Sequence, residues 1–226
     1  MTCVEPTTRT AKSEHTRELI VETALRLFRE RGFEATTMRA IAAEAGVSVG
    51  NAYYYFASKE QLIQAYYERS QAEHEAACER ILAEERDFGA RLRGVLRAWV
   101  EVSEPYHAFA VKFFKHAAEP DNPLSPFSAE SSPARDRAIG IYREVVEGAD
   151  IRVDPELRAE LPELLWLASM GVVLYWVHDS SPGCERTYRL IDLSVPLIER
   201  LVAVSWLPGM RGIARDFIAA VHELRA

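Results

Sequence analysis

Cysteine is scarce in this chain of 226 residues, and its three copies, Cys3, Cys78 and Cys184, lie far apart without a CxxC pair. This pattern excludes a disulfide framework and is typical of a reducing compartment. Long apolar runs are missing too. The most apolar stretch, residues 164–177, is shorter than the roughly 20 residues that span a bilayer, and no apolar run marks a signal peptide at the start. We therefore expect a soluble, cytoplasmic protein.

The sequence also lacks the patterns of common catalytic sites. It contains no GxSxG, no phosphate-binding Walker loop, no GxGxxG after a strand and no HExxH. We therefore expect no enzymatic activity, no catalytic residue, no bound metal and no cofactor. An enzyme of a helical-lyase type and an interaction scaffold without DNA binding remain alternatives from other functional classes.

The composition is that of an ordinary globular protein, with 48% hydrophobic and 27% charged residues and a net charge of −7. This acidic balance argues against a nucleic-acid surface spread over the whole molecule. Residues 1–60 contain eight basic and eight acidic side chains, so the remaining residues carry the entire negative charge. The N-terminal part is therefore the better candidate for contact with a polyanion.

The apolar residues recur with helical spacing, and no alternating run indicates a strand. Ile20, Ala24 and Leu27 form one stripe, and Gly32 is suited to ending that helix. Interruptions between the predicted helices follow at 87–89, in a proline-rich loop at 121–133, at the 181–183 turn and at 208–209. We predict an all-α protein of roughly nine or ten helices, the last over about 211–225. Pro196 is expected to kink the helix that contains it.

Residues 36–56 predict two short helices joined by a turn that contains Gly46, which is the pattern of a helix-turn-helix. Gly46 can turn the backbone with positive φ, and Ser48 can cap the second helix. Ser58 and Gln61 form a capping box for the long helix that follows. The predicted second helix has no acidic residue, as entry into a phosphate-lined groove requires. Its outward face carries Ser48, Gly50, Asn51, Tyr53 and Tyr54.

These residues resemble the DNA-binding domain of TetR/AcrR-type transcriptional regulators over about residues 15–65. The resemblance rests on Leu27-Phe28, Gly32-Phe33, Thr36-Thr37, Arg39, Ile41-Ala42, Ala45-Gly46-Val47-Ser48, Gly50, Tyr53, Tyr55-Phe56, Lys59 and Leu62. It implies a helix-turn-helix domain at 13–58 and a helical effector-binding and dimerisation domain at 59–226. Residues 1–12, which are rich in Thr and polar groups, predict a loose tail before them. The resemblance also implies DNA contacts for Thr37, Arg39, Ser48, Gly50, Asn51, Tyr53, Tyr54 and Lys59.

The resemblance further implies a homodimeric regulator, expected to be a repressor that a small and largely apolar molecule releases from a palindromic operator. Residues 164–177 and the leucines of the following helix provide a surface that can form a four-helix interface between two copies. Large side chains in the central helices exceed what a tight bundle needs. The candidate effector contacts are Trp99, Phe109, Phe113, His116, Trp166, Met170 and Tyr175.

One further alternative concerns His74 and Cys78, which lie four residues apart on one predicted helix face. Two ligands with this spacing can belong to a metal site, so a metal- or redox-sensing regulator stays open. No further His or Cys lies near them in the sequence.

Overall fold

A computed structural model describes residues 11–119 and 122–205, together with positions 212, 216 and 223. Its elements in this part are helices, with no strand, which confirms the predicted all-α class. The α-helices are α1 (Ala11–Arg31), α2 (Met38–Glu44), α3 (Val49–Tyr55), α4 (Lys59–Glu84), α5 (Phe88–Ser103), α6 (His107–Ala117), α7 (Ser132–Glu147), α8 (Pro155–Val177) and α9 (Glu185–Val204), with short 3-10 turns at Glu104–Tyr106 and Pro182–Cys184. The predicted helix at 211–225 lies outside the described residues, as does most of the predicted tail. Helix α1 already begins at Ala11.

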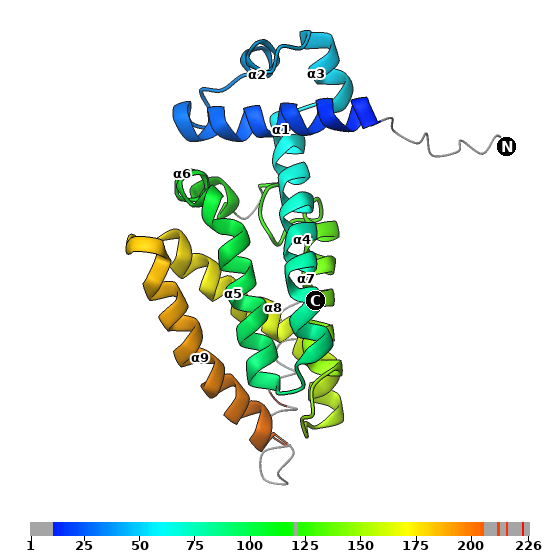
Figure 1. Ribbon diagram of the computed structural model, residues 1–226, viewed down its shortest axis with the longest axis vertical. Coiled ribbons are helices and arrows are strands. Elements are labelled where there is room, and N and C mark those ends of the chain that lie inside the picture. The colour runs from blue at the N-terminus through cyan, green and yellow to red at the C-terminus, as the bar shows by residue number, and fades with distance from the viewer. Residues whose placement is uncertain (1–10, 120–121, 206–211, 213–215, 217–222, 224–226) are drawn as a thin grey trace, which may run out of the picture. The chain divides into compact units, whose positions relative to one another are not determined.

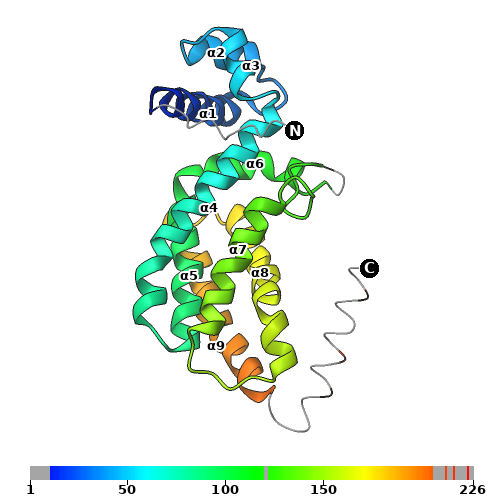
Figure 2. The same cartoon turned by 90° about the vertical axis from the view of Figure 1, so that its right-hand side faces the viewer.

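The chain forms two compact units. Met1–Tyr67 and Ala108–Ser131 make up the first unit, and Glu68–His107 and Ser132–Ala226 make up the second. We call them the N-terminal unit and the helical unit. Figure 1 shows α1, α2 and α3 of the N-terminal unit, and Figure 2 shows α5, α7 and α8 of the helical unit. The sequence-based boundary at residue 58 did not anticipate that α6 and the loop after it group with the N-terminal helices.

The core of the N-terminal unit is built on the predicted stripe of α1, since Ile20, Ala24 and Leu27 are completely buried. Helix α1 ends where expected, at Gly32, whose φ of +89° lies in the region that glycine adopts at little cost. Phe33 then folds back, with its ring centroid 5.0 Å from that of Phe28.

In the helical unit, α7 packs on α8, and α5 packs on both α7 and α9. The guanidinium of Arg91 on α5 is buried among these elements. It donates to the carbonyls of Leu82 and Glu85 at the end of α4 and of Glu144 and Val145 at the end of α7. A positive charge at two helix C-termini is favourable because the carbonyls there carry partial negative charge. Arg91 thus joins the ends of α4 and α7.

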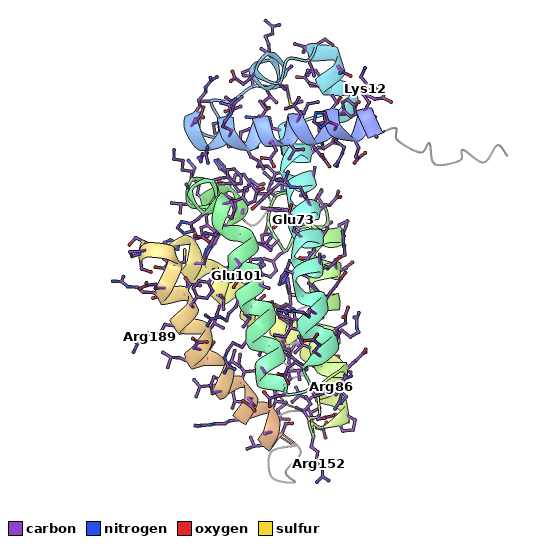
Figure 3. All side chains as sticks on the ribbon, viewed as in Figure 1. Lys12, Glu73, Arg86, Glu101, Arg152 and Arg189 are labelled. Carbon is purple, nitrogen blue, oxygen red and sulfur yellow. The ribbon has the colours of Figure 1, made fainter. Side chains whose placement is uncertain are left out.

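Charged side chains cover the outer surface of the helical unit. Figure 3 labels Glu73, Glu101, Arg86, Arg152 and Arg189, and all five are exposed. The two carboxylates among them, Glu73 and Glu101, face the solvent, as expected for this type of side chain.

Helix α8 is an exception to this charged surface. By length and composition it is the one helix in the described residues that could cross a membrane. A core helix of a globular protein has the same properties, and α8 buries Leu165, Trp166 and Trp176 while it packs against α7 and α9. Pro196 lies inside α9, and the helix continues through it from Glu185 to Val204.

Candidate nucleic-acid interface

Helices α2 and α3 form the predicted helix-turn-helix through local hydrogen bonds that the sequence encodes. The Thr37 hydroxyl accepts from the Ala40 amide and caps α2, and the Ser48 hydroxyl accepts from the Asn51 amide and caps α3. Between them Gly46 adopts a φ of +67°. Ala42 and Ala52 are completely buried, which lets the two helices pack closely. These local interactions fix the orientation of α3 relative to α2 with very few residues.

The outer face of α3 is polar, aromatic and free of carboxylates. Tyr54 is 80% exposed and Tyr53 is 51% exposed. Ser48 and Gly50 are exposed and Asn51 is half-buried. No acidic residue occurs from Ala45 to Lys59, so this face does not repel a phosphate backbone. Its shape and chemistry suit insertion into the major groove of DNA, which admits an α-helix.

Tyr55 and Phe56, which follow these two tyrosines, make contacts inside the N-terminal unit. Phe56 is buried, with the Arg17 guanidinium 5.2 Å from its ring centroid. The Tyr55 hydroxyl lies 3.1 Å from the Ser13 hydroxyl of α1. Of the four consecutive rings, two are therefore exposed on α3 and the other two contact α1.

Lys59 and the start of α2 supply the remaining candidate contacts. The Lys59 ammonium donates to the Phe33 carbonyl at 2.7 Å and lies 4.4 Å from the Phe33 ring centroid. It is thus held at the start of α4, with part of its donor capacity used inside the chain. Thr37 and Arg39 are exposed. Val49, the first residue of α3, was not among the predicted contacts, and its apolar side chain is 38% exposed.

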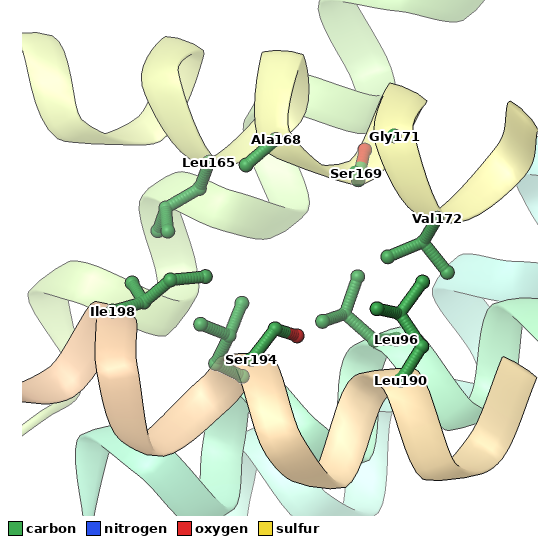
Figure 4. A pocket seen from close by; sticks show the side chains of 10 residues that line it. Leu96, Leu165, Ala168, Ser169, Gly171, Val172, Leu190, Ser194 and Ile198 are labelled. Atoms are coloured by element: carbon green, nitrogen blue, oxygen red, sulfur yellow. The ribbon is translucent and has the colours of Figure 1, made fainter. Parts of the chain in front are cut away.

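The helical unit contains an apolar cavity of about 280 Å³ between α5, α8 and α9. Figure 4 shows side chains of α8 and α9 facing each other across it. It is lined by Leu92, Leu96, Leu165, Ala168, Ser169, Gly171, Val172, Leu190, Ser194 and Ile198. The hydroxyls of Ser169 and Ser194 donate to the carbonyls of Trp166 and Ile191 in their own helices. The cavity therefore presents an almost wholly aliphatic surface.

Comparison with known families matches both parts of the chain. A family described as bacterial regulatory proteins, tetR family, matches residues 20–66, and one described as tetracyclin repressor-like, C-terminal domain, matches residues 91–219, which is more than half of the chain. The chain belongs to the TetR family. The resemblance proposed from residues 15–65 is confirmed.

Curated relatives of this TetR-family chain match over short segments. The uncharacterized HTH-type transcriptional regulator YerO of Bacillus subtilis is 49% identical over 47 residues, which are 21% of this chain and 16% of YerO. The HTH-type transcriptional repressor KstR2 of Mycobacterium tuberculosis is 35% identical over 92 residues, 41% of this chain and 46% of KstR2. The chain thus spans less than half the length of either relative.

Solved structures share the fold along most of the chain. The TetR transcriptional regulator from Nitrosomonas europaea has a TM-score of 0.62 at 20% identity, covering 80% of this chain and 96% of its own. Thermus thermophilus FadR in complex with lauroyl-CoA has a TM-score of 0.51 at 24% identity, covering 77% and 92%. AibR in complex with isovaleryl coenzyme A and operator DNA has a TM-score of 0.54 at 21% identity, covering 80% and 97%.

The seven candidate effector contacts of this TetR-family chain are distributed over both units. Phe109, Phe113 and His116 of α6 lie in the N-terminal unit. There Phe109 packs on Phe28, and Phe113 and His116 pack on Phe33, with centroid distances of 5.5 to 6.3 Å. These side chains form a cluster around the end of α1.

The other four candidates belong to the helical unit. Trp166 is buried, Trp99 and Met170 are half-buried and Tyr175 is 42% exposed. Trp99 packs edge-on against Trp176 at 5.1 Å. The cavity is lined by other residues, and none of the seven candidates is among them. Apolar helix positions alone do not tell which neighbour each will face.

The possible metal ligands His74 and Cys78 are both buried in α4. The Nε2 atom of His74 lies 2.9 Å from the Val95 carbonyl. Burial raises the pKa of Cys78 to about 12, which disfavours a metal-binding thiolate. Within the described residues, no group of three or more His, Cys, Asp or Glu side chains could hold a metal ion.

Proposed function

We propose that this chain is a homodimeric, sequence-specific DNA-binding repressor that a small molecule with an apolar group releases from a palindromic operator. It acts in the cytoplasm and has no catalytic role. The observation that carries the proposal is the carboxylate-free outer face of α3, held by the Thr37 and Ser48 caps on a helix-turn-helix. Membership of the TetR family supports the same assignment.

Base recognition falls to Asn51, with phosphate contacts from its neighbours. An Asn side chain can pair with adenine through its N6 and N7 atoms, and Asn51 lies in the first turn of α3 beside the exposed Gly50 and Tyr54. Tyr53 and Arg39 have exposed polar groups that can reach the backbone. Lys59 has donors beyond the one given to the Phe33 carbonyl, and α4 begins at this residue, so a phosphate there also meets the free amides of a helix N-terminus.

Selection from random duplex DNA, followed by affinity measurements, tests this assignment. Wild type should select a two-fold symmetric consensus, and Asn51→Ala should lose preference at one position per half-site, at a cost of roughly 1–3 kcal/mol. Tyr55→Phe is the matched control, because the Tyr55 hydroxyl faces Ser13 inside the unit. Failure of the wild type to select any sequence contradicts the proposed function.

Salt dependence separates the phosphate contacts from the base contacts. Lys59→Ala should weaken binding to all sequences alike and reduce the slope of log affinity against log salt by about one unit. Lys115→Ala, which removes an exposed lysine of α6, should leave the slope unchanged. An altered consensus with an unchanged slope for Lys59→Ala contradicts the phosphate role.

Support for an apolar effector comes from the aliphatic cavity of the helical unit. Two structures of the same fold were solved with acyl-CoA molecules, lauroyl-CoA with FadR and isovaleryl coenzyme A with AibR. We infer that the effector of this chain also carries an aliphatic group. Repression fits the name of the KstR2 relative, a transcriptional repressor.

Support for the homodimer comes from exposed apolar residues on α8 and α9. Twelve large hydrophobic side chains in the described residues are exposed, and six of them lie on these two helices: Leu167, Leu174, Tyr175, Leu193, Leu197 and Leu201. We call these six residues the apolar stripe. An exposed apolar surface of this kind marks an interaction site, and two neighbouring helices from each copy can form a four-helix interface.

A further inference from the structure

Exposed apolar side chains are concentrated on α3. Three of the twelve large exposed hydrophobic residues in the described part of the chain, Val49, Tyr53 and Tyr54, lie on this helix of seven residues. Each tyrosine ends in a hydroxyl group that can hydrogen-bond, whereas the side chain of Val49 has no polar atom. A β-branched residue also has a lower helix propensity than alanine. The fold therefore does not account for an exposed valine here, and its place in an apolar cluster marks a contact with another molecule.

Gly50 lies at the centre of the outer face of α3. With about 3.6 residues per turn, Val49 and Tyr53 lie on one side of this glycine. Asn51 and Tyr54 lie on the other side. A Cβ atom added at Gly50 would meet nothing within 4 Å, so the rest of the chain leaves this face open. Because glycine has no side chain, the helix can approach a surface closely, and its neighbours reach different parts of that surface.

The charges around Val49 fit DNA as the molecule that it contacts. No acidic residue occurs from Ala45 to Lys59, and the side chain of Arg39 is exposed at the start of α2. Phosphates line the edges of the major groove and attract such cations, while the base edges form its floor. An apolar group among cations and without carboxylates is suited to this floor.

The floor of the major groove offers only one kind of apolar group. Every base pair presents hydrogen-bond donors and acceptors there, and thymine adds its C5 methyl group. An isopropyl group placed against a donor or an acceptor removes water from it without replacing the hydrogen bond, which is unfavourable. Against a methyl group, the same side chain buries apolar surface of both partners, which is favourable. The position of Val49 therefore favours a base that carries a C5 methyl group.

We propose that Val49 reads the C5 methyl group of a pyrimidine, which is thymine in an unmodified operator, and that it is a specificity-determining residue in addition to Asn51. This inference rests on the proposed function, because the contact exists only when α3 lies in the major groove. Valine has one strongly preferred χ1 rotamer in a helix, so it loses little conformational freedom when it packs on the methyl group. Tyr53 lies four residues further along and is its neighbour on the helix surface, where its ring can shield the contact from water.

The same chemistry extends to a modified base. The methyl group of 5-methylcytosine is attached to the same ring atom as that of thymine, so it presents the same apolar surface in the groove. Replacing the thymine by cytosine removes the methyl group, and methylation of this cytosine restores it. We therefore expect operator affinity to depend on cytosine methylation at the position that Val49 contacts.

The test compares thymine with uracil, which lacks only the C5 methyl group. Wild type first selects its operator from random duplex DNA, and uracil then replaces each thymine in turn, at the symmetric positions of both half-sites. Burial of one methyl group changes an affinity by about four-fold, so uracil in both half-sites at the position that Val49 reads should weaken binding by about 15-fold. A selected operator in which no thymine shows such a penalty overturns the proposal.

Variants at position 49 connect the methyl group to this side chain. Val49→Ala removes both γ-methyl groups and should reduce the uracil penalty to less than about two-fold. This variant should bind the uracil operator about as tightly as wild type does, which also verifies its fold. Val49→Ile keeps a β-branched apolar side chain and should keep the penalty. Val111→Ala, which truncates a 50% exposed valine of α6, is the matched control and should keep it too. A full penalty in Val49→Ala assigns the methyl contact to another residue, such as Tyr54, and overturns the proposal.

Cytosine and 5-methylcytosine at the same position provide an independent measurement. Methylation of this cytosine in both half-sites should strengthen the binding of wild type by about 15-fold and change that of Val49→Ala by less than about two-fold. Equal affinity of wild type for the two duplexes contradicts a contact with the methyl group. Failure of wild type to select any sequence would instead contradict the proposed function, whereas a symmetric consensus without a uracil penalty overturns only the role of Val49.

Discussion

Asp179 shows how one side chain orders the connection between α8 and α9. It is 5% exposed, and its carboxylate accepts hydrogen bonds from the amide and hydroxyl of Ser181 and from the amide and hydroxyl of Thr187. Burial alone would raise the pKa of Asp179, but these four donors outweigh it and lower the pKa to about 2. The ionised form is therefore the one that the fold stabilises.

This lowered pKa predicts an acid-dependent loss of stability. The unfolded pKa of Asp is about 3.9, so the contribution of Asp179 is complete above that pH and is lost as the pH falls toward 2. The difference corresponds to about 2–3 kcal/mol. Urea unfolding of wild type and Asp179→Asn should show a gap of about this size at pH 5 that narrows between pH 4 and pH 2. Glu101→Gln, at an exposed carboxylate, should show no such gap, and a constant Asp179→Asn gap across this range would contradict the assignment.

Local signals explain why the helix-turn-helix could be predicted from the sequence. The caps at Thr37 and Ser48 and the left-handed Gly46 involve residues within a few positions of one another, and each has a strong residue preference. The capping box at Ser58 is also present, although the Gln61 side chain accepts from the amide of Ala57 instead of Ser58. Interactions between residues only a few positions apart can be predicted from the local sequence.

Long-range pairings could not be predicted in the same way. Phe109 and Phe113 lie four residues apart on α6, which predicts an apolar face but does not identify the neighbour that covers it. The structure pairs them with Phe28 and Phe33. Similarly, an arginine at position 91 gives no signal that it will be buried among four carbonyls from two other helices.

The hydrogen bonds of Arg91 to two helix ends predict how its replacement changes the stability of the protein. Arg91→Met leaves several buried carbonyls without donors and should lower the free energy of unfolding by about 2–4 kcal/mol. A Cβ atom at Gly148 would lie 2.3 Å from the Arg91 Nη2 atom, so Gly148→Ala should cost roughly 1–3 kcal/mol. In the Arg91→Met background the same change should cost much less, as denaturant unfolding of the four proteins can measure.

Gly140 in α7 provides the matched control for this cycle. A Cβ atom there would meet nothing within 4 Å, and replacing glycine by alanine inside a helix typically gains up to about 1 kcal/mol. Gly140→Ala should thus be neutral or stabilising in both backgrounds. Equal costs of Gly148→Ala with and without Arg91 would show that the two residues do not interact.

At the scale of the whole molecule, the candidate DNA contacts lie in the N-terminal unit, and the apolar cavity and the apolar stripe lie in the helical unit. The charge-balanced N-terminal residues include the carboxylate-free face of α3, and the acidic remainder includes the apolar stripe on α8 and α9. A single helix-turn-helix makes few base contacts. Two copies held on successive major-groove faces, about 34–36 Å apart, bind as one bivalent unit, and the stripe is the surface that can hold them.

Disruption of the stripe should therefore weaken operator binding without touching α3. Joining two binding modules typically raises affinity by 10²–10⁴-fold over one module, so Leu193→Glu with Leu197→Glu should lose a factor in this range on the full operator. On a duplex with a single half-site, the variant should bind as wild-type chains do at concentrations where they are monomeric. Fluorescence anisotropy on both duplexes measures the two affinities, with Val111→Glu as the control. If the variant keeps wild-type affinity for the full operator, the chains pair through another surface, because the geometry of two half-sites still requires two recognition helices at a fixed separation.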